Sequence, residues 1–348
     1  MDRVIRVLVV DDSAYVRKVV KQMLSRSPFI EVVGTARDGI EALSMTEKLA
    51  PDVVTCDLIM PEMDGTTFVR EQMARKPLPI VIMSIANESG ELALAALDSG
   101  AIDFVQKPTA LATEKIFEVS DDLIEKVKAA SKVSLSKWRA IEQAGVIEAR
   151  RAAPTERARL VDAIVLGIST GGPQALKYLI PQLPAELPAP MAMVLHMPVG
   201  YTELYARKLD EMSPLKVIEA REGDAFEAGV ILLAPAGQHL SFRRDGDGRV
   251  RAHLGSRPFD MPHRPSVDVL FQSAAEVFND RVLGLVMTGM GTDGRQGAAW
   301  IKAQGGMIFT EAEETCVVYG MPHSVVEAGL SDRCVPLDQM ARAILEVV

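Results

Sequence analysis

The chain has 348 residues, 48% of them hydrophobic, which is enough for two domains of ordinary size with separate cores. Its formal net charge of −9 disfavours a nucleic-acid-binding protein, because such proteins usually carry a basic surface. No apolar run reaches the roughly 20 residues that span a bilayer, and the charged N-terminus does not resemble a signal peptide. The three cysteines show neither metal-binding nor disulfide spacing, so we expect a cytoplasmic protein without direct membrane insertion.

The first expected domain, residues 1–125, alternates short apolar runs with amphipathic helical stretches. The expected strands are Ile5–Val10, Glu31–Ala36, Val53–Asp57, Ile80–Ser84 and Asp103–Lys107, and the expected helices include Tyr15–Leu24, Gly39–Leu49 and Leu92–Leu97. This alternation predicts an α/β fold with a doubly wound parallel sheet, as in flavodoxin. In such sheets ligands bind outside the carboxyl ends of the strands.

Residues 126–159 are rich in Ala, Lys, Arg and Glu with poor apolar spacing, and we expect a helical tail that runs into an exposed linker. A second α/β series then fills residues 160–348. Its expected strands are Ala163–Ile168, Met191–His196, Val230–Ala234, Val282–Met287 and Met307–Thr310, and its expected helices are Pro173–Ile180, Val267–Phe278, Gly294–Ala303 and Leu337–Val347. The stretch Leu240–Leu254 reads as a small antiparallel hairpin, because Asp-Gly pairs in its middle favour a tight turn.

Five polar residues of the first domain follow or end expected strands, namely Asp11, Asp12, Asp57, Ser84 and Lys107. Each acid alone is more typical of a helix cap or a strand end, but together they are expected to meet at one edge of the sheet. Neighbouring carboxylates repel one another, and Mg²⁺, which prefers oxygen ligands, neutralises them and bridges to a phosphoryl group. Asp57 can then carry an acyl phosphate, while Lys107 pairs with its oxygens and the Ser84 hydroxyl bonds one of them.

This pattern resembles the receiver domain of two-component response regulators over essentially all of residues 1–125. The matching residues are Val10-Asp11-Asp12, Asp57, Met60-Pro61, Asp64-Gly65, Ser84, Gly100-Ala101, Phe104 and Lys107-Pro108. The Mg²⁺ ligands that the resemblance implies are Asp11, Asp12, Asp57 and the backbone carbonyl of Ile59. It also implies that Asp57 is phosphorylated, that Phe104 changes rotamer together with Ser84, and that a chemotaxis-type histidine kinase is the phosphodonor.

The pattern G-x-S-x-G occurs at Gly167–Gly171, between an expected strand and an expected helix. A serine on such a turn is exposed near a helix N-terminus, where developing negative charge is favoured. Ser169 is a weak nucleophile by itself and needs a base with an orienting acid. His196 ends one expected strand and Asp293 follows another, so both are expected at the same sheet edge as Ser169.

A rival base is His323, because the order Ser169, Asp293, His323 is that of α/β-hydrolases. Strand-end geometry favours His196, and both alternatives remain open on spacing alone. The remaining histidines, His239, His253 and His263, are interpreted as surface or capping residues.

A different class of function is suggested by Gly289–Gly294, which has the pattern G-x-G-x-x-G with Glu311 about 20 residues later. That arrangement is typical of a dinucleotide-binding turn with its ribose-binding acid. The Asp293 carboxylate opposes this interpretation, because it would lie where a pyrophosphate needs backbone N–H groups. The same carboxylate is useful if it holds an imidazolium.

The second domain resembles the catalytic domain of chemotaxis protein-glutamate methylesterases, the CheB family. The matching stretches are Gly167–Gly172, His196-Met197-Pro198, Ala234–Leu240, Pro265–Phe271 and Thr288–Gly294. The resemblance implies a triad of Ser169, His196 and Asp293. It further implies that the backbone N–H of Met290 contributes to the oxyanion hole and that Thr170 lines the site.

The implied substrates are glutamate methyl esters on methyl-accepting chemoreceptors, with deamidation of receptor glutamines at the same site. No cofactor is implied for hydrolysis. Phosphorylation at Asp57 is expected to relieve a block of the hydrolase by the receiver. The alternatives are a receiver-linked dinucleotide enzyme and a non-catalytic signalling module.

Overall fold

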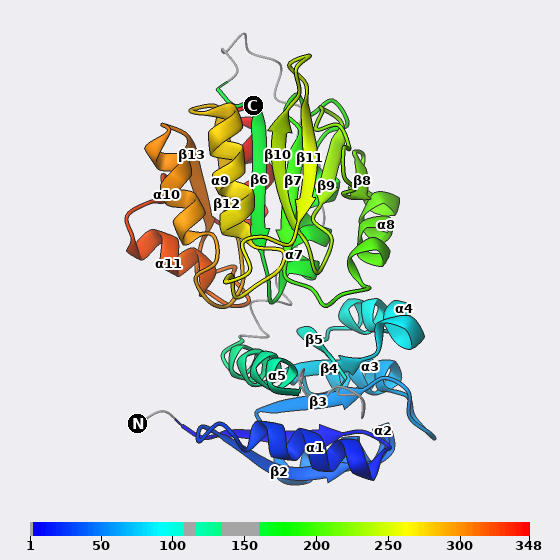
Figure 1. Cartoon of the computed structure of the whole chain (residues 1–348). Helices are drawn as coiled ribbons and strands as arrows, with labels where there is room; N and C mark the ends of the chain where they lie inside the picture. The colour runs from blue at the N-terminus through cyan, green and yellow to red at the C-terminus, as the bar shows by residue number, and fades with distance from the viewer. Residues whose placement is uncertain (1–2, 108–115, 134–159) are drawn as a thin grey trace. The chain divides into compact units, whose positions relative to one another are not determined.

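The computed structural model describes residues 3–107, 116–133 and 160–348 (Figure 1). The chain divides into two units, residues 1–135 and 136–348. The boundary expected at residue 125 falls inside helix α5, Ile116–Ala130, which continues into the segment where a helical tail was expected. Most of the expected linker, residues 134–159, lies outside the described residues.

The sheet of the first unit has the strand order β2-β1-β3-β4-β5, and all neighbouring strands are parallel. The strands are β1 Ile5–Val10, β2 Ile30–Ala36, β3 Val53–Asp57, β4 Ile80–Ser84 and β5 Asp103–Gln106. The helices besides α5 are α1 Ala14–Leu24, α2 Gly39–Leu49, α3 Gly65–Arg75 and α4 Ala86–Asp98. Helices α1 and α5 pack together, and α3 packs against both α2 and α4, as a doubly wound sheet requires. The predicted fold of this domain is confirmed.

Polar caps and one glycine bring the helices of this unit close to the strand ends. The Asp64 carboxylate accepts the N–H of Thr67 at 2.8 Å and begins α3. At Gly65, the first residue of that helix, a Cβ would lie 2.1 Å from the backbone oxygen of Asp57. A side chain there would push α3 away from the end of β3, so the glycine permits a close approach to Asp57.

The second unit is built on seven parallel strands in the order β14-β13-β12-β6-β7-β9-β8. The strands are β6 Ala163–Ile168, β7 Met191–Leu195, β8 Lys216–Glu219, β9 Val230–Leu233, β12 Val282–Val286, β13 Met307–Glu311 and β14 Arg333–Val335. The predicted hairpin is the antiparallel ribbon of β10, His239–Arg244, and β11, Val250–Gly255. Strand β6 lies at the centre between β12 and β7, so three adjacent strands end beside one another.

Helices of the second unit form two groups around its sheet (Figure 1). They are α7 Gly172–Leu179, α8 Thr202–Met212, α9 Val267–Phe278, α10 Arg295–Ala303, α11 Met321–Glu327 and α12 Leu337–Leu345. Helix α9 packs against α10, the central strands and the β10–β11 ribbon, while α7 contacts α8 and α12. The resulting core is mostly aliphatic, with Phe271 of α9 fully buried in it and Phe226 and Phe242 stacked on each other.

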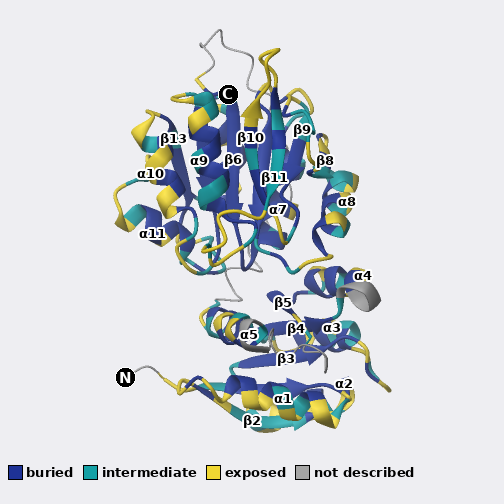
Figure 2. Ribbon diagram, viewed as in Figure 1, coloured by how far each residue is buried: buried dark blue, intermediate teal, exposed yellow. Residues whose placement is uncertain are grey.

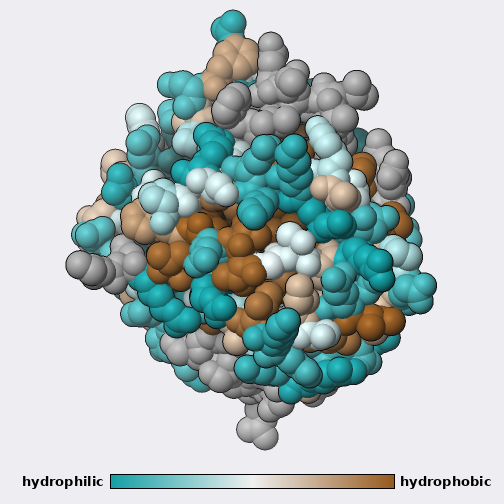
Figure 3. All heavy atoms as spheres, turned by 90° about the horizontal axis from the view of Figure 1, so that it is seen from below, coloured by the Kyte–Doolittle hydropathy of each residue, from teal (hydrophilic) through white to brown (hydrophobic). Residues whose placement is uncertain are grey.

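Burial follows the expected pattern of parallel sheets, whose central strands are covered on both faces (Figure 2). The outer strand β2 differs, because its central residues are only half-buried. Seen from below Figure 1, apolar side chains gather in a patch that hydrophilic residues surround (Figure 3). Within the described parts of the chain, no helix is long and apolar enough to cross a membrane.

Candidate functional site

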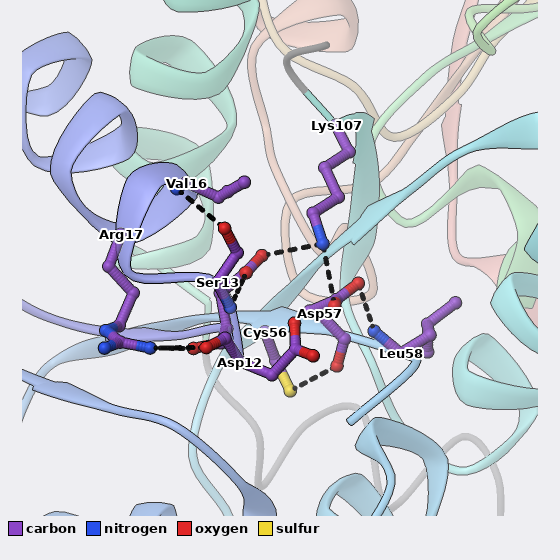
Figure 4. Close-up of polar contacts among 9 residues, drawn as sticks. Asp12, Ser13, Val16, Arg17, Cys56, Asp57, Leu58 and Lys107 are labelled. Carbon is purple, nitrogen blue, oxygen red and sulfur yellow. Dashed lines mark hydrogen bonds and ion pairs between the residues drawn. The ribbon is translucent and has the colours of Figure 1, made fainter. Parts of the chain in front are cut away.

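Three carboxylates of the first unit lie together at the carboxyl ends of β1 and β3 (Figure 4). One oxygen from each of Asp11, Asp12 and Asp57 lies within 4.8 Å of the others. Asp11 and Asp57 are buried, whereas Asp12 is exposed. The ammonium of Lys107 lies 3.0 Å from Oδ2 of Asp11 and 2.8 Å from Oδ2 of Asp57. The structure therefore brings together four of the residues that the sequence assigned to this site.

The electrostatics of this cluster favour an additional cation. Burial raises the pKa of Asp11 above its ordinary value, and the charge of Asp57 adds to this, although Lys107 and the N–H of Ser13 act against it. Burial would lower the pKa of Lys107, but its bonds to the two carboxylates outweigh that effect and raise it. One ammonium thus contacts two of the three carboxylates, and the donor atoms of the cluster are all oxygens, which is the donor set that fits Mg²⁺.

The other predicted residues of the first unit lie at or near the ends of β3, β4 and β5. Ser84, at the end of β4, and Phe104, in β5, are both 1% exposed. The backbone N–H of Leu58 donates to Oδ1 of Asp57 at 2.8 Å and orients that carboxylate. The side chain of Ile59, two residues after Asp57, is 52% exposed.

In the second unit Ser169 directly follows the central strand β6, on the turn that leads into α7. Gly171 in this turn has φ +79°, which favours glycine. The N–H of Ser169 donates to the carbonyl of Thr288 at 2.9 Å, which ties the turn to the end of β12. A Cβ at Gly289 would lie 2.8 Å from Cβ of Ser169, so the loop after β12 packs directly on the serine.

His196 follows β7 and bonds Asp293, from the loop after β12, through its Nε2 at 2.8 Å. The carboxylate of Asp293 accepts three further hydrogen bonds, from the Ser266 hydroxyl at 2.9 Å and the N–H groups of Val267 at 2.8 Å and Asp268 at 3.0 Å. Burial alone would raise the pKa of Asp293. The hydrogen bond and charge of His196, together with the backbone donors, outweigh burial and hold that pKa well below its ordinary value.

The other nitrogen of the His196 ring, Nδ1, is buried and has no hydrogen-bond partner among the described residues. Asp293 occupies Nε2, so Nδ1 is the nitrogen that can accept a proton. The exposed ring of His263 stacks on His196 with centroids 4.1 Å apart. The rival His323 is exposed in α11 and contacts Tyr319 edge-on, and its side chain makes no bond to Asp293.

The loop after β12 and the turn after β6 supply the remaining predicted groups. Within the described parts of the chain, the backbone N–H of Met290 donates no hydrogen bond. Thr170, next to the serine, is 2% exposed, and its carbonyl accepts the Thr288 hydroxyl at 3.0 Å. An N–H without a partner next to Ser169 suits the developing charge of an oxyanion.

Glu311 does not take the place of a ribose-binding acid, because its side chain is fully buried. Its carboxylate accepts the N–H of Thr288 at 2.9 Å and the hydroxyl of Thr315 at 3.0 Å. Burial raises the pKa of Glu311 to about 7, although these donors act against the shift. The carboxylate of Glu311, the acid that suggested a dinucleotide turn, thus anchors the backbone of the loop beside Ser169.

A model of the CheB methylesterase family matches residues 164–344, and a model of the response regulator receiver domain matches residues 7–118. The chain is 47% identical over 97% of its length to protein-glutamate methylesterase/protein-glutamine glutaminase 5 of Myxococcus xanthus, of which it covers 96%. The chain belongs to the CheB methylesterase family.

Two further relatives agree with the match to this family. A protein-glutamate methylesterase/protein-glutamine glutaminase of Pyrococcus abyssi is 40% identical over 99% of this chain and 94% of its own length. The crystal structure of the Thermotoga maritima CheB methylesterase catalytic domain matches with a TM-score of 0.53 and 39% identity. That match covers 54% of this chain and 99% of the solved domain.

Three features of this CheB-family site were not expected from the sequence, namely the hydroxyl of Ser266, the stacking of His263 and the role of Asp268. The Asp268 carboxylate accepts the N–H groups of Gly294 at 2.9 Å and Gly297 at 2.7 Å, at the start of α10. Asp293, just before α10, thus caps the start of α9, and Asp268, in the first turn of α9, caps the start of α10, which no local sequence signal reveals. The hydroxyl of Ser266, directly before α9, makes no bond to the N–H groups of that helix and bonds Asp293 instead.

Proposed function

We propose that this chain hydrolyses glutamate methyl esters, and deamidates glutamines, on methyl-accepting chemoreceptors under the control of phosphorylation. Relatives that match nearly the whole chain carry the name protein-glutamate methylesterase/protein-glutamine glutaminase. The observation that carries the proposal is the bond between His196 and Asp293, on a loop that packs directly against Ser169. These residues are our candidates for base, orienting acid and nucleophile.

In the proposed reaction the hydroxyl oxygen of Ser169 attacks the ester carbonyl, while Nδ1 of His196 takes its proton. Asp293 holds the proton on Nε2 and stabilises the imidazolium that forms. The N–H of Met290 donates to the oxyanion, and one such donor is worth about 3–4 kcal/mol of the barrier. The imidazolium then protonates the leaving methoxide, and methanol departs.

Hydrolysis of the acyl-enzyme repeats these roles with water as the nucleophile. Nδ1 of His196 takes a proton from water, the C–O bond to Ser169 breaks, and the serine oxygen regains the proton. Glutamate is released on the receptor. A glutamine side chain follows the same course with ammonia as the leaving group, so one site serves both substrates. We propose that Thr170 lines this site beside the serine.

For the first unit we propose Asp57 as the phosphorylated residue, with a chemotaxis-type histidine kinase as phosphodonor. One carboxylate oxygen of Asp57 bonds to phosphorus while the P–N bond of the donor phosphohistidine breaks. Asp11, Asp12, Asp57 and the backbone carbonyl of Ile59 would hold Mg²⁺, which neutralises charge on the phosphoryl oxygens. Lys107 and the Ser84 hydroxyl bind those oxygens, and Phe104 responds to the movement of Ser84.

We further propose that residues 1–125 act as the regulatory receiver, 126–159 as the linker and 160–348 as the hydrolase, and that the chain meets its partners in the cytoplasm. Phosphorylation changes a local charge and biases a receiver between two states, which relieves a block of the hydrolase. Asp57→Ala is expected to remove activation by a small phosphodonor while basal hydrolysis persists. Equal activation of both proteins would refute this control.

The deciding test is methanol release from methylated receptor membranes. Ser169→Ala is expected to lower kcat by roughly 10⁶-fold, in line with loss of the nucleophile in other serine hydrolases, and to leave phosphorylation of Asp57 intact. Full activity of the variant would refute the assignment. A wild-type protein without methanol release would instead favour a non-catalytic module, and a rise in melting temperature with NAD would favour the dinucleotide enzyme.

A further inference from the structure

Residues 256–266, here called the arginine loop, connect the β10–β11 ribbon to α9 and border the proposed hydrolase site. His263 of this loop stacks on His196 at 4.1 Å, and the hydroxyl of Ser266 bonds Asp293 at 2.9 Å. Positions 256–260 are all exposed. A polypeptide whose side chain reaches Ser169 therefore has this loop within reach, beside the reacting group.

The arginine loop presents one aromatic ring between two guanidinium groups. Phe259 is 63% exposed, and the guanidinium carbons of Arg257 and Arg264 lie 5.7 Å and 5.5 Å from its ring centroid. Such cation–π contacts hold the guanidiniums in place without neutralising them. Neither arginine pairs with a carboxylate within the described parts of the chain, and Asp260 in the same loop forms no ion pair.

Arg264 also carries a donor that lacks a partner. Its Nε atom is buried and makes no hydrogen bond to any residue that the structure describes. A buried donor without an acceptor costs free energy, and the cost is larger for a charged group. Because Nε is buried, an incoming group meets the terminal nitrogens of the guanidinium, and a carboxylate suits those N–H donors.

The positive charge continues into a cleft of about 500 Å³ between the ribbon and the loop. Arg243, His253 and Arg257 line this cleft. The carboxylate of Glu222 lies 3.0 Å from Nδ1 of His253 and near enough to Arg243 that this arginine helps to lower the pKa of Glu222. Arg257 has no carboxylate partner among the described residues. In a chain with a formal net charge of −9, this cleft is a local basic site, and such a site attracts an acidic partner at short range.

We infer that the arginine loop recognises an acidic helix of the substrate, by binding carboxylates that flank the glutamyl ester or glutamine. This inference rests on the proposed function and adds the sequence context of the reacting residue to it. On a helix, side chains three and four positions apart lie on one face at about 5–6 Å spacing. Carboxylates so placed would meet Arg264 and Arg257, while Phe259 covers an apolar side chain between them.

The test uses two synthetic helices that carry one glutamyl methyl ester, with either glutamates or alanines three and four positions away. Affinity is measured on the full chain with Ser169→Ala, so that binding is read without turnover, and kcat/KM is measured with Ser169 present. The variants are Arg264→Gln and the exposed Arg257→Gln. The control is Arg249→Gln, which removes the same charge at the far end of the ribbon, next to the turn.

Arg264→Gln is expected to weaken binding and lower kcat/KM for the glutamate helix about tenfold, and Arg257→Gln about threefold. Both variants and the control should match the parent protein on the alanine helix and on a small neutral ester. Added salt should narrow the difference between the two helices, because it screens exposed charges.

Equal affinity of the parent protein for both helices would overturn the inference, as would unchanged binding by both variants. Equal losses on the neutral ester would also overturn it, since they would indicate damage to the site. Displacement of the acidic helix by a single-stranded oligonucleotide at lower concentration would assign the loop to nucleic acid instead. Failure of the proposed function is distinguishable, because methanol release would then be absent while the binding comparison still decides this inference.

Discussion

Both units place an aspartate with a largely inaccessible side chain beside the end of a parallel strand, but they surround the two carboxylates in opposite ways. Asp293 accepts hydrogen bonds from His196, Ser266, Val267 and Asp268, and its pKa is held low. In the first unit, Asp11 and Asp57 share one ammonium and crowd together with Asp12, and burial raises the pKa of Asp11.

The difference teaches how the same residue type is prepared for two tasks. A carboxylate that must stay ionised and orient a base needs all its acceptor positions filled by donors from the protein. A carboxylate that must bind a cation and attack phosphorus needs acceptor positions that stay open until its ligands arrive. Asp293 receives four donors and Asp57 receives two, so the number of filled acceptor positions, rather than burial, separates the proposed orienting acid from the proposed nucleophile.

The largest test of this comparison is Asp293→Asn. The amide has nearly the same shape but is neutral, so it no longer stabilises an imidazolium or fixes the tautomer of His196. We expect kcat for ester hydrolysis to fall by about 10⁴-fold, as in other Ser-His-Asp enzymes, with phosphorylation of Asp57 unchanged. A loss below tenfold, in a variant with an unaltered circular dichroism spectrum, would refute the orienting role.

Glu311 adds a third carboxylate to the comparison. It is buried and accepts hydrogen bonds, but no cation pairs with it among the described residues. Its folded pKa of about 7 lies above the ordinary 4.5, so the unfolded chain loses this proton first as pH rises. Its contribution to stability is complete below pH 4.5 and is lost as pH rises through 7, on the order of 3 kcal/mol.

The matched variant is Glu311→Gln, which keeps an acceptor for the N–H of Thr288 but does not titrate. We expect unfolding of the second unit by urea, compared at about pH 5 and about pH 8, to lose this pH dependence. An equal slope in both proteins would show that Glu311 is ionised throughout. A similar kcat for both proteins is expected, because the hydrogen bond to Thr288 persists.

A smaller effect is expected at the donor side of Asp293. Ser266→Ala removes one hydrogen bond to the ionised carboxylate, and we expect kcat to fall about tenfold. The pKa that governs the acidic limb of the pH–rate profile is expected to rise. The control is Ser273→Ala in the same helix, whose hydroxyl bonds only backbone groups, of Leu270 and Phe242. That control should lower the melting temperature without changing kcat, and equal kcat losses would contradict the assignment.

The smallest effect is expected at the cluster of Asp11, Asp12 and Asp57 in the first unit. Asp11→Asn removes one of three crowded carboxylates, so without divalent ions at neutral pH we expect the first unit to gain about 1 kcal/mol. Mg²⁺ should stabilise the wild-type protein by about 2.7 kcal/mol at a hundredfold excess over its Kd, and the variant much less. Destabilisation by Asp11→Asn would show that the pairing with Lys107 outweighs the repulsion.

Much of the fold was predictable from the sequence, because the central strands are uninterrupted apolar runs. The expected ends of β6 and β12, for example, agree with the structure to within one residue. The edge strands β8 and β14 were missed, since they have four and three residues and their polar side chains resemble loops. Helix α8 was missed for a similar reason, as most of its residues are polar.

The candidate site likewise has one part that the sequence predicted and one part that it did not. Strand ends predicted that Ser169, His196 and Asp293 would meet, and the structure brings Asp293 to 2.8 Å from His196. The four-donor shell of Asp293 and the stacking of His263 depend on how α9 and its preceding loop pack, which no local pattern encodes. The alternative interpretation of Glu311 was wrong, because spacing along the chain does not reveal that its carboxylate faces the core.

The exchange of caps between α9 and α10 also has a consequence for local motion. The amides of Val267 and Asp268 are bound by Asp293, while those of Gly294 and Gly297 are bound by Asp268. Neither helix start can open without releasing the other, so these four protons should exchange with solvent as one cooperative group. The orienting acid is thereby protected from the fraying that helix ends normally show, and its position becomes as durable as the packing of the two helices.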